Sequence, residues 1–598
     1  MTKNDIVKEN EKQELKRPIT GIIQEDRIWE QWYDQKKMQE DLPKMNQADY
    51  VFKCNRDYPN QTIINNRGLK KLTNQEFTNL RNKFISSLTA LGIKRGDVIA
   101  TVALSTPELL ALKYAAAYLG AITANLNFND ASNQKMYEQL KMINPTMIFF
   151  LDIFENQVYE VLNNLEFKDS LKVRLPLSVS TPIFNTERFK INLLETSNKM
   201  QKKVVKDALT YKQFREYSLY GHLPDSVYFE KLPSNIALTS GTTGKSKAIL
   251  LSHDANNALA KQHEIADLGL QRGETNLALV PPFLAFWDAD IIHMAMCLGI
   301  ENILELKLTY DNIPEYLKKH LPNYGIWSQY LWDSILHLPK EDLKKISSHL
   351  KKVVVGGERA DVNQANRFQE ITGIRQEAGY GASEMDSCFS VANPRCNLIG
   401  SAGLPLPFNN VMVKDENGND LTYNQPGHLY ITGPAMMNGY LNNKELTNQV
   451  LIRDSKGTLW YDTKDYGYVD KTGTLFVLDR YQEPVNINSL SIQLIDIAEK
   501  VKQCEVVKLC KVNYTNGKMI FQVSFDEFAE KTKEECEQEL IDYINNNFKD
   551  FEKPDILSIQ DSLPRTPVGK VDYQKLNENA KLFSKEAIDG VKIKVLKR

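Results

Sequence analysis

The sequence contains few cysteines, and none of them stands in a metal-binding pattern. The seven cysteines form no CxxC pair and no Cys/His spacing of the kind that zinc sites use: Cys54, Cys297, Cys388, Cys396, Cys504, Cys510 and Cys536. Disulfide frameworks belong to oxidising compartments and use cysteines in even numbers. We therefore predict a reducing compartment and no structural zinc site.

The chain also lacks an apolar run long enough for a membrane helix. Its most apolar long stretch, residues 98–126, is interrupted by Glu108 and Lys113, whereas a membrane span needs about 20 mostly apolar residues. Residues 1–17 mix basic with acidic side chains and lack the apolar centre of a signal peptide. We predict a cytoplasmic protein with no integral membrane segment, with a flexible tail at residues 1–17 and a C-terminal tail at residues 581–598.

Net charge is the third feature that is nearly absent. Lys and Arg together number 74 against 76 Asp and Glu, which leaves a net charge of -2. No overall field attracts nucleic acid, so we expect no nucleic-acid partner, and any phosphate binding must be local. Oligomeric state does not follow from these counts.

Apolar strand-like segments alternate with helical periodicity over much of the chain. Residues 97–103 read as a strand and 107–119 as a helix, and further strands are expected at 146–151, 276–280 and 352–355. At 598 residues the chain needs several cores, because a single core stops growing at about 250–300 residues. The pattern predicts an α/β fold, with a large N-terminal domain of two βαβ-type sheet subdomains plus a β-rich subdomain.

The sequence pattern changes twice in the second half of the chain. Short strands and Gly/Asn/Pro turns follow Gly400, and a Lys/Glu-rich segment with amphipathic helical stretches at 495–504 and 534–548 follows Arg480. The second change predicts a domain boundary, with an N-terminal domain over 18–480 and a small α+β C-terminal domain over 483–580.

One loop carries the clearest chemical signal. It offers two glycines, hydroxyls and two lysines in a row: Thr239, Ser240, Gly241, Thr242, Thr243, Gly244, Lys245, Ser246 and Lys247. Glycine-rich backbone N–H groups, hydroxyls and ammonium groups together favour a polyphosphate. A polar hairpin turn without a ligand is the alternative interpretation. A Walker A loop does not fit, because Thr239 stands where its first Gly is required and a strand-like run follows.

This loop resembles the Thr-Ser-Gly-Thr-Thr-Gly-x-Pro-Lys-Gly motif of the adenylate-forming superfamily. That superfamily contains acyl-CoA synthetases, amino-acid adenylation domains and firefly luciferase. Ser246 replaces the Pro and Ala248 replaces the last Gly. Further segments resemble the family's motifs in the family's order, over about residues 65–580: 355–358, 379–384, 427–433, 439–440, 460–470 and 563–572.

The resemblance implies a role for individual residues. Gly357 and Glu358 would lie beside adenine, with the 379–384 motif (Gly379, Tyr380, Gly381 and Ser383) supplying a stacked Tyr. Glu384 would hold Mg²⁺, and Asp465 and Arg480 would bind ribose and phosphate. Lys570 would be the adenylation lysine, delivered by a small mobile domain that rotates about a hinge at 481–482. Taken singly, Glu384 and Lys570 are more typical of solvated surface than of a site, and Asp465 or Arg480 could belong to a surface ion pair.

Four further substitutions depart from the family pattern: Lys464 and Asp479 for Gly, Gln482 at the hinge, and Ser489 where Gly is usual. Gln482 falls at the hinge about which the family's small domain rotates, and Ser489 falls on the face that meets CoA. Adenylation is therefore supported better than thioester formation.

Substrate choice is expected to depend on residues 281–290. Phe283, Phe286 and Trp287 would line an apolar pocket, or else belong to the core. Asp288 stands where amino-acid-activating domains pair a carboxylate with the substrate ammonium.

These observations predict ATP-dependent activation of a carboxylic acid to acyl-AMP with release of pyrophosphate, followed by transfer to CoA. ATP, Mg²⁺ and coenzyme A would be the cofactors, and a small carboxylic acid the partner. Two alternatives stay open: an amino-acid-type adenylating enzyme, and a catalytically degenerate member with a structural or binding role.

Overall fold

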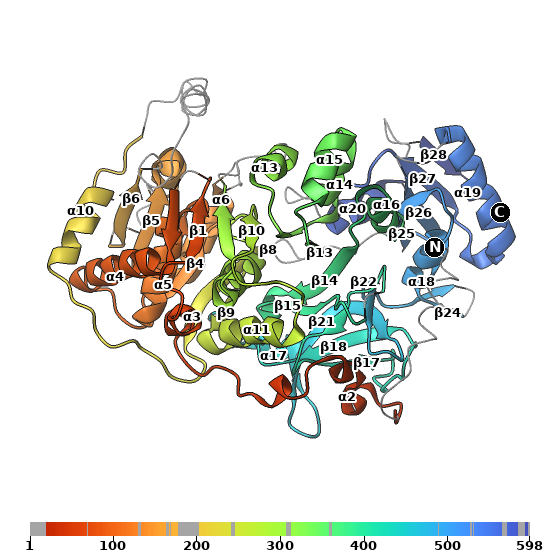
Figure 1. Cartoon of the computed structure of the whole chain (residues 1–598). Helices are drawn as coiled ribbons and strands as arrows, with labels where there is room; N and C mark the ends of the chain where they lie inside the picture. The colour runs from red at the N-terminus through yellow and green to blue at the C-terminus, as the bar shows by residue number, and fades with distance from the viewer. Residues whose placement is uncertain are drawn as a thin grey trace.

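The computed structural model describes residues 19–68, 70–128, 133–162, 167, 169–176, 203–240, 246–305, 313–357, 362–396, 398–487, 490–526, 529, 531–564, 571–583 and 592–595. They form two large, mostly parallel sheets, a five-stranded sheet and a four-stranded sheet near the C-terminal end. In Figure 1 the chain passes from the first large sheet at the left, through the second in the centre, to the four-stranded sheet at the right.

The first large sheet contains the strand that leads into the candidate phosphate loop. Its strands are β3 (Val98–Val102), β4 (Ile122–Asn125), β5 (Met147–Leu151), β6 (Leu171–Leu175), β7 (Leu209–Thr210), β8 (Pro233–Ser240), β9 (Ser246–Ser252) and β19 (Gly439–Tyr440). The order across the sheet is β19-β9-β8-β4-β3-β5-β6-β7. The strands from β8 to β7 run parallel, whereas β9 and β19 are antiparallel to their neighbours.

The second large sheet contributes the two glycine-containing motifs. Its strands are β1 (Thr62–Asn66), β2 (Lys70–Thr73), β10 (Thr275–Ala278), β11 (Glu301–Leu304), β12 (Tyr324–Trp327), β13 (Lys352–Gly356), β14 (Gln376–Ala382), β15 (Ser387–Val391) and β16 (Leu404–Pro405). The order is β16-β15-β14-β13-β12-β10-β11-β1-β2. The strands from β14 to β1 are parallel, and the strands beyond them at each edge are antiparallel.

A third sheet follows Gly400, as the short strand-like segments and turn residues after that position predict. It consists of β17 (Asn410–Lys414), β18 (Gly427–Thr432), β20 (Leu451–Arg453), β21 (Leu459–Val469) and β22 (Leu475–Arg480), all paired antiparallel. The long strand β21 and its neighbour β22 end beside the second large sheet, where the ribose-binding candidates lie.

The C-terminal part has a hydrophobic core of its own. It contains β23 (Val485–Ile487), β24 (Leu490–Ile492), α18 (Leu494–Val501), β25 (Val507–Thr515), β26 (Lys518–Phe525), α19 (Lys533–Asn547), β27 (Ile556–Gln560), α20 (Tyr573–Phe583) and β28 (Lys592–Val595). Ile497 of α18, Phe521 of β26 and Leu540 of α19 are buried in one cluster that includes no residue before Val485. The predicted amphipathic stretches are thus the helices α18 and α19.

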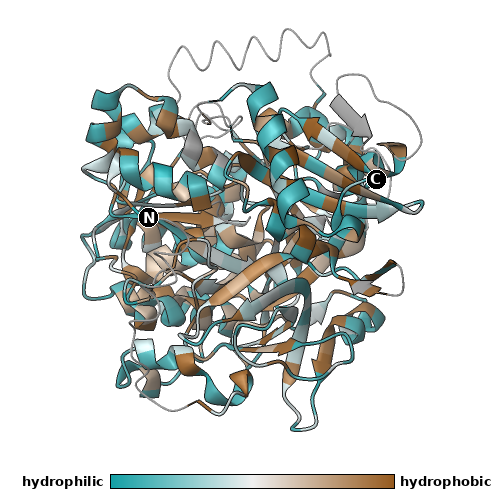
Figure 2. Ribbon diagram, turned by 90° about the vertical axis from the view of Figure 1, so that its right-hand side faces the viewer, coloured by the Kyte–Doolittle hydropathy of each residue, from teal (hydrophilic) through white to brown (hydrophobic). Residues whose placement is uncertain are grey.

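Helices cover both faces of the large sheets, and the brown apolar strands of Figure 2 lie inside this cover. The remaining α-helices are α2 (Ile23–Asp26), α3 (Gln47–Asn55), α4 (Asn74–Ala90), α5 (Pro107–Tyr118), α6 (Gln134–Ile143), α7 (Glu155–Leu162), α10 (Tyr211–Glu216), α11 (His253–Ala266), α12 (Ala295–Leu298), α13 (Ile313–His320), α14 (Gln329–Asp333), α15 (Lys340–Ser347), α16 (Val362–Thr372) and α17 (Lys444–Val450). The π-helix η6 (Trp287–Met294) precedes α12.

Helix α5 shows how the local sequence fixes these elements. Pro107 occupies the first turn, where its missing N–H is not needed, and the Thr106 hydroxyl accepts the N–H of Leu109. The helix is buried on all sides, including Glu108 and Lys113. A helix that is apolar nearly all round belongs in a core, which explains why residues 98–126 are so hydrophobic without spanning a membrane.

The predicted α/β fold class is confirmed. Within the described residues, no helix is both long enough and apolar enough to cross a lipid bilayer.

Candidate functional site

The candidate phosphate loop joins two antiparallel strands. Thr239 of β8 pairs with Lys247 of β9, and Ser240 pairs with Ser246. Gly241, Thr242, Thr243, Gly244 and Lys245 lie outside the described residues. A Walker A loop leads into a helix, so the strand β9 excludes that motif, as the apolar run after the loop predicts.

Lys247 and Glu384 are connected through a tyrosine. The Lys247 Nζ lies 5.3 Å from the centre of the Tyr440 ring, and the Tyr440 hydroxyl donates to Glu384 Oε1 at 2.7 Å. Strand β19 places Tyr440 there by pairing with β9, with Tyr440 opposite Ile249. The phosphate hairpin and the proposed Mg²⁺ carboxylate therefore belong to one site. The sequence did not assign Tyr440 a role, although the Gly439-Tyr440 pair is one of the resembling segments.

Glu384 lies in a short turn between β14 and β15. Ser383–Met385 form a single 3₁₀ turn, which Asp386 ends in a left-handed conformation with φ 51°. The Glu384 side chain is buried, and no lysine or arginine of the described chain forms an ion pair with it. A carboxylate oxygen without a basic partner is the kind of ligand that Mg²⁺ takes together with water and phosphate oxygens. The residues present thus fit the predicted ion.

Tyr380, Asp465 and Arg480 meet in a hydrogen-bonded trio. The Tyr380 hydroxyl donates to Asp465 Oδ2 at 2.5 Å, and Arg480 Nη1 lies 3.1 Å from Asp465 Oδ1. These residues come from β14, β21 and β22, and the pairing of Asp465 with Arg480 across β21 and β22 explains how two distant motifs converge. The trio unites the predicted adenine-stacking and ribose-binding residues at one place.

Burial governs the ionisation of the two acidic members of this trio. Desolvation raises the pKa of Asp465 above 3.8, although the Arg480 charge and the Tyr380 hydrogen bond oppose it. Desolvation also raises the pKa of Tyr380, and the charge of Asp465 adds to that increase. Tyr380 is therefore a hydrogen-bond donor at neutral pH, and Asp465 is a carboxylate whose ionised form depends on Arg480.

Lys464 occupies the position where the resembling family has Gly, and its backbone explains that preference. Its φ is 57°, in the left-handed region that glycine adopts without steric cost. The Lys464 carbonyl accepts the Tyr481 N–H at 2.8 Å, and its ammonium group lies 2.6 Å from Asp462 Oδ2. The substitution keeps the turn that presents Asp465.

The backbone explains why two positions in the motifs are glycine. Gly357 follows β13 with φ 87°. A Cβ at Gly381 would lie 1.5 Å from the Ser387 carbonyl oxygen, at a β-bulge between β14 and β15. At Gly379, next to the backbone of β13, a Cβ would meet its nearest atom at 3.6 Å. Gly381 is thus required by the fold, whereas Gly379 is not.

The predicted substrate residues are mostly enclosed. Phe283 packs edge-to-face on Phe128 with ring centres 5.1 Å apart, and the fully buried Trp287 donates its Nε1–H to Ser105 Oγ at 2.9 Å. Phe286 is half-buried. Asp288 pairs with Lys113, with Oδ1 3.0 Å from Nζ and both side chains 5% exposed or less. Asp288 therefore already has a cationic partner inside the protein.

Two more buried carboxyl groups, Asp386 and Asp290, lie near this pair. Asp386 accepts a hydrogen bond from Asn256 Nδ2 at 2.7 Å, and Asp290 lies 3.2 Å from His263 Nε2. Burial raises the pKa of Asp386 well above 3.8, and the charges of Asp288 and Asp290 raise it further. This acidic interior was not expected from a segment that reads as apolar.

The hinge region is held by contacts that the sequence did not reveal. Asp479, which stands in place of a family Gly, forms an ion pair with Lys511 of β25 at 3.0 Å, and both side chains are 6% exposed or less. Tyr481 stacks on His428 with ring centres 4.4 Å apart and an interplanar angle of 6°. Lys570, Glu358 and Ser489 lie outside the described residues, so their predicted roles remain predictions.

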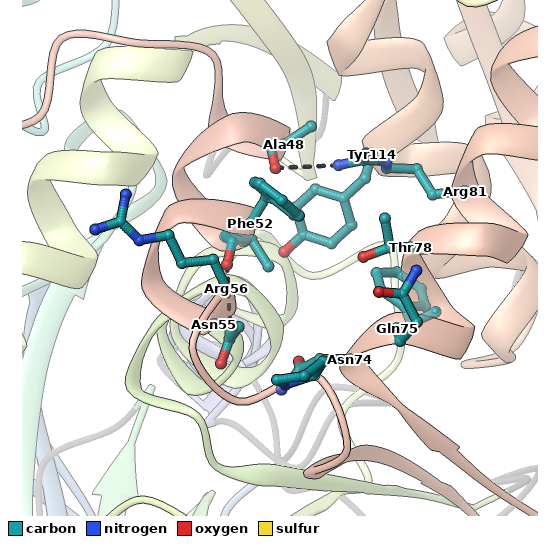
Figure 3. A pocket seen from close by; sticks show the side chains of 12 residues that line it. Ala48, Phe52, Asn55, Arg56, Asn74, Gln75, Thr78, Arg81 and Tyr114 are labelled. Atoms are coloured by element: carbon teal, nitrogen blue, oxygen red, sulfur yellow. Dashed lines mark hydrogen bonds between the residues drawn. The ribbon is translucent and has the colours of Figure 1, made fainter.

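A surface pocket elsewhere is too small for a substrate. It lies between α3, α4 and α5, encloses about 40 Å³ and is bordered by Ala48, Phe52, Arg81 and Tyr114. In Figure 3 the Arg81 guanidinium closes one side, where it donates to the Ala48 carbonyl oxygen at 3.3 Å. None of the predicted site residues lines it.

Known proteins match most of this chain. A long-chain-fatty-acid–CoA ligase of Bacillus subtilis is 24% identical over 545 residues, covering 87% of this chain and 92% of the relative. A probable 4-coumarate–CoA ligase 2 of Dictyostelium discoideum is 23% identical and covers 90% of this chain and 96% of the relative.

Solved structures share the fold. ATP-bound MatB from Rhodopseudomonas palustris has a TM-score of 0.73 at 17% identity, over 90% of this chain and 99% of that one. The anthranilate CoA ligase AuaEII in complex with anthranoyl-AMP also has a TM-score of 0.73 at 17% identity, over 91% of this chain and 99% of that one.

The family model described as AMP-binding enzyme matches residues 51–441, well over half of the chain. This range contains the phosphate hairpin, the 379–384 motif and Tyr440, while Asp465 and Arg480 follow it. Together with the convergence of these residues in one site, the match shows that the chain belongs to the AMP-binding enzyme family.

Proposed function

We propose that this protein activates a carboxylic acid as acyl-AMP, with release of pyrophosphate, and then transfers the acyl group to coenzyme A. The observation that carries the proposal is the convergence of two groups, Lys247–Tyr440–Glu384 and Tyr380–Asp465–Arg480, which are joined by the β14–β15 hairpin that carries both Tyr380 and Glu384. The first group supplies charges for phosphates, and the second supplies hydrogen-bond partners for a ribose.

The chemistry needs position and charge more than covalent help. A carboxylate oxygen attacks the α-phosphate, and pyrophosphate leaves from the opposite side, so negative charge must be stabilised throughout. Lys247 and the loop 239–245 would hold the β- and γ-phosphates, with Glu384 as protein ligand of Mg²⁺. Asp465 would accept hydrogen bonds from the ribose hydroxyls, and Arg480 would stay beside it. Mg²⁺ supplies charge neutralisation at the phosphates when bound.

The acid is proposed to be a fatty or aromatic acid rather than an amino acid. In an amino-acid-activating site, Asp288 would have to pair with the substrate ammonium. Here Lys113 occupies that position, and Gln47 Oε1 accepts a further hydrogen bond from the same ammonium at 3.2 Å. The relatives that match most of the chain are ligases of long-chain fatty acids and of 4-coumarate.

The domain arrangement belongs to the same proposal. We place the large domain at 18–480 and the hinge at 481–482, with Lys570 carried by the small domain that follows. The sequence predicts that the small domain ends at 580, but α20 continues to Phe583 and β28 pairs with β27, so it extends into the predicted C-terminal tail. The separate core of the residues after Val485 supports this division. The reaction is proposed to take place in the cytoplasm, where ATP and CoA are present.

ATP–pyrophosphate exchange across fatty, aromatic and amino acids tests the proposal. Exchange with fatty or aromatic acids, together with CoA thioesters detected by mass spectrometry, is expected. Asp288→Asn should retain exchange with those acids. Exchange with amino acids alone, lost in Asp288→Asn, would support the amino-acid alternative, and silence of the folded protein across the panel would support the degenerate one.

Lys570→Ala separates the two half-reactions. It should reduce acyl-AMP formation by at least about 100-fold, because the loss of a preorganised charge at the reacting phosphate costs about 3 kcal/mol. Thioester formation from supplied acyl-AMP should stay within a few-fold of wild type. Equal loss in both assays would contradict the rotation of the small domain.

A further inference from the structure

Three metal-ligating side chains that the proposed reaction does not use meet behind the 379–384 motif. His263 lies on α11, Asp290 on the π-helix η6 and Cys388 on β15. One ligand atom from each lies within 4.8 Å of the other two. His263 and Asp290 are 4% and 3% exposed. Three separate elements therefore bring a nitrogen, an oxygen and a sulfur ligand to one buried point.

The spacing suits a tetrahedral ion. With metal–ligand bonds of about 2.0–2.3 Å, neighbouring ligand atoms in a tetrahedral Zn²⁺ site lie about 3.3–3.6 Å apart. His263 Nε2 and Asp290 Oδ1 are 3.2 Å apart, close to that length. The Cys388 thiol donates to the Ser390 carbonyl oxygen at 3.4 Å, and thiols are weak donors. This bond costs little to give up, so the sulfur is available to a metal.

The local charge balance favours a cation. Asp290 has no lysine or arginine partner among the described residues, and Lys113 pairs with Asp288. The fully buried Asp386 lies beside them, and its Oδ1 has no hydrogen-bond partner in the described part of the chain. Buried carboxylates without cations are costly. A divalent ion would bring to Asp290 the positive charge that no lysine or arginine of the described residues supplies.

We propose that His263, Asp290 and Cys388 bind a divalent transition-metal ion of the Zn²⁺ class. The mixed nitrogen, oxygen and sulfur set selects such an ion over Mg²⁺ or Ca²⁺, which prefer oxygen ligands. Binding replaces the thiol proton of Cys388, which leaves to solvent, by a metal–sulfur bond. The Ser387 hydroxyl donates to Asp290 Oδ2 and orients its carboxylate in the way that outer hydrogen bonds orient metal ligands.

The site would fasten β15 to α11 and η6. Cys388 stands opposite Gly381 in the register of β14 and β15, so a metal at Cys388 would also stabilise the turn that carries Glu384. The ion would act on the structure of the neighbouring site, and would be distinct from the Mg²⁺ proposed at Glu384.

Metal analysis of the full chain tests the site directly. Protein purified without chelators should contain about one zinc per chain. After removal of zinc, Co²⁺ titration should produce a thiolate-to-cobalt charge-transfer band, which an oxygen-only site at Glu384 cannot give. Cys388→Ser should lose both the zinc and the band. Cys396→Ser is the control, since Cys396 is a buried cysteine whose sulfur lies 3.6 and 3.4 Å from the hydroxyl oxygens of Thr472 and Thr474, and it is not one of the three proposed ligands.

A second measurement does not depend on folding of the variants. Anomalous scattering at the zinc edge from wild-type crystals should show a peak between the three side chains. Absence of zinc from the wild type together with absence of the cobalt band, an anomalous peak elsewhere, or a Cys388→Ser protein that retains both signals would overturn the proposal.

Discussion

At the residue scale, the site is organised by hydroxyl groups that link distant motifs. Tyr440 connects Lys247 with Glu384, and Tyr380 connects the 379–384 motif with Asp465. A hydrogen bond to a charged acceptor contributes about 1.5–3 kcal/mol. Each tyrosine is therefore expected to affect activity far more than its contact with substrate alone would suggest.

Tyr440→Phe tests the first link. Loss of the hydroxyl leaves Glu384 without its 2.7 Å donor, so kcat/KM for MgATP should fall about 10–100-fold. Tyr514→Phe in β25 is the control and should stay near wild type. Unchanged kinetics in Tyr440→Phe would mean that Glu384 is positioned by other contacts.

Asp465 gives a pH-dependent prediction. Because burial raises its pKa in the folded protein, the folded state binds the proton more tightly than the unfolded chain does. The ionised carboxylate therefore lowers the stability of the folded protein at neutral pH. This destabilisation disappears as the pH falls below the pKa that Asp465 has in the unfolded chain. Each unit of difference between the folded and unfolded pKa corresponds to about 1.4 kcal/mol. Asp465→Asn should be more stable than wild type at pH 7, with a difference that shrinks toward pH 4 in chemical denaturation. A pH-independent difference would contradict this assignment.

At the element scale, the β14–β15 hairpin carries residues of both the proposed nucleotide site and the proposed metal site. Its bulge requires Gly381, its turn carries Glu384, and its second strand carries Cys388. Much of this could be predicted from sequence, because the Gly-Tyr-Gly motif, the strand that precedes it and the strand-like run after Lys247 are all local signals.

Other features could not be predicted locally. Tyr440 reaches Glu384 only through pairing of β19 with β9, which are far apart in sequence. Three carboxylates are buried in the structure: Asp288, Asp290 and Asp386. The hydrophobic pattern of their segments predicts burial, but it does not predict which partners these carboxylates have. Lys464 could be read only as a departure from Gly until its φ was known.

Gly381→Ala tests the hairpin. A Cβ would overlap the Ser387 carbonyl oxygen, so the strands must separate, with an expected loss of about 3 kcal/mol or more in unfolding free energy. Gly379→Ala is the matched control in the same strand and should cost less than about 1 kcal/mol, since its nearest contact is ordinary. Equal thermal stability of the two variants would contradict the close approach of Gly381 to the Ser387 carbonyl oxygen at the bulge.

At the scale of the whole molecule, the ion pair between Asp479 and Lys511 joins the third sheet to the C-terminal unit. Removal of one member of a buried pair costs about 3–5 kcal/mol, because it leaves the other charge unpaired. Lys511→Met alone should therefore destabilise the arrangement, and Lys511→Met with Asp479→Gly should recover most of the loss. Limited proteolysis around residues 480–483 measures the release of the unit; equal cleavage of all variants would show that the pair does not restrain it.

The neighbouring position of Asp479 and Arg480 gives this pair a wider significance. Asp479 pairs with Lys511 of the C-terminal unit, while the next residue, Arg480, pairs with Asp465, the carboxylate proposed to bind ribose. Nucleotide binding at Asp465 and Arg480 would be coupled to the C-terminal unit if it changed the contact between Asp479 and Lys511, and such a coupling would be reciprocal. If the small domain rotates as proposed, the factor by which bound nucleotide changes that rotation is also the factor by which the rotation changes nucleotide affinity, so product release would depend on domain movement.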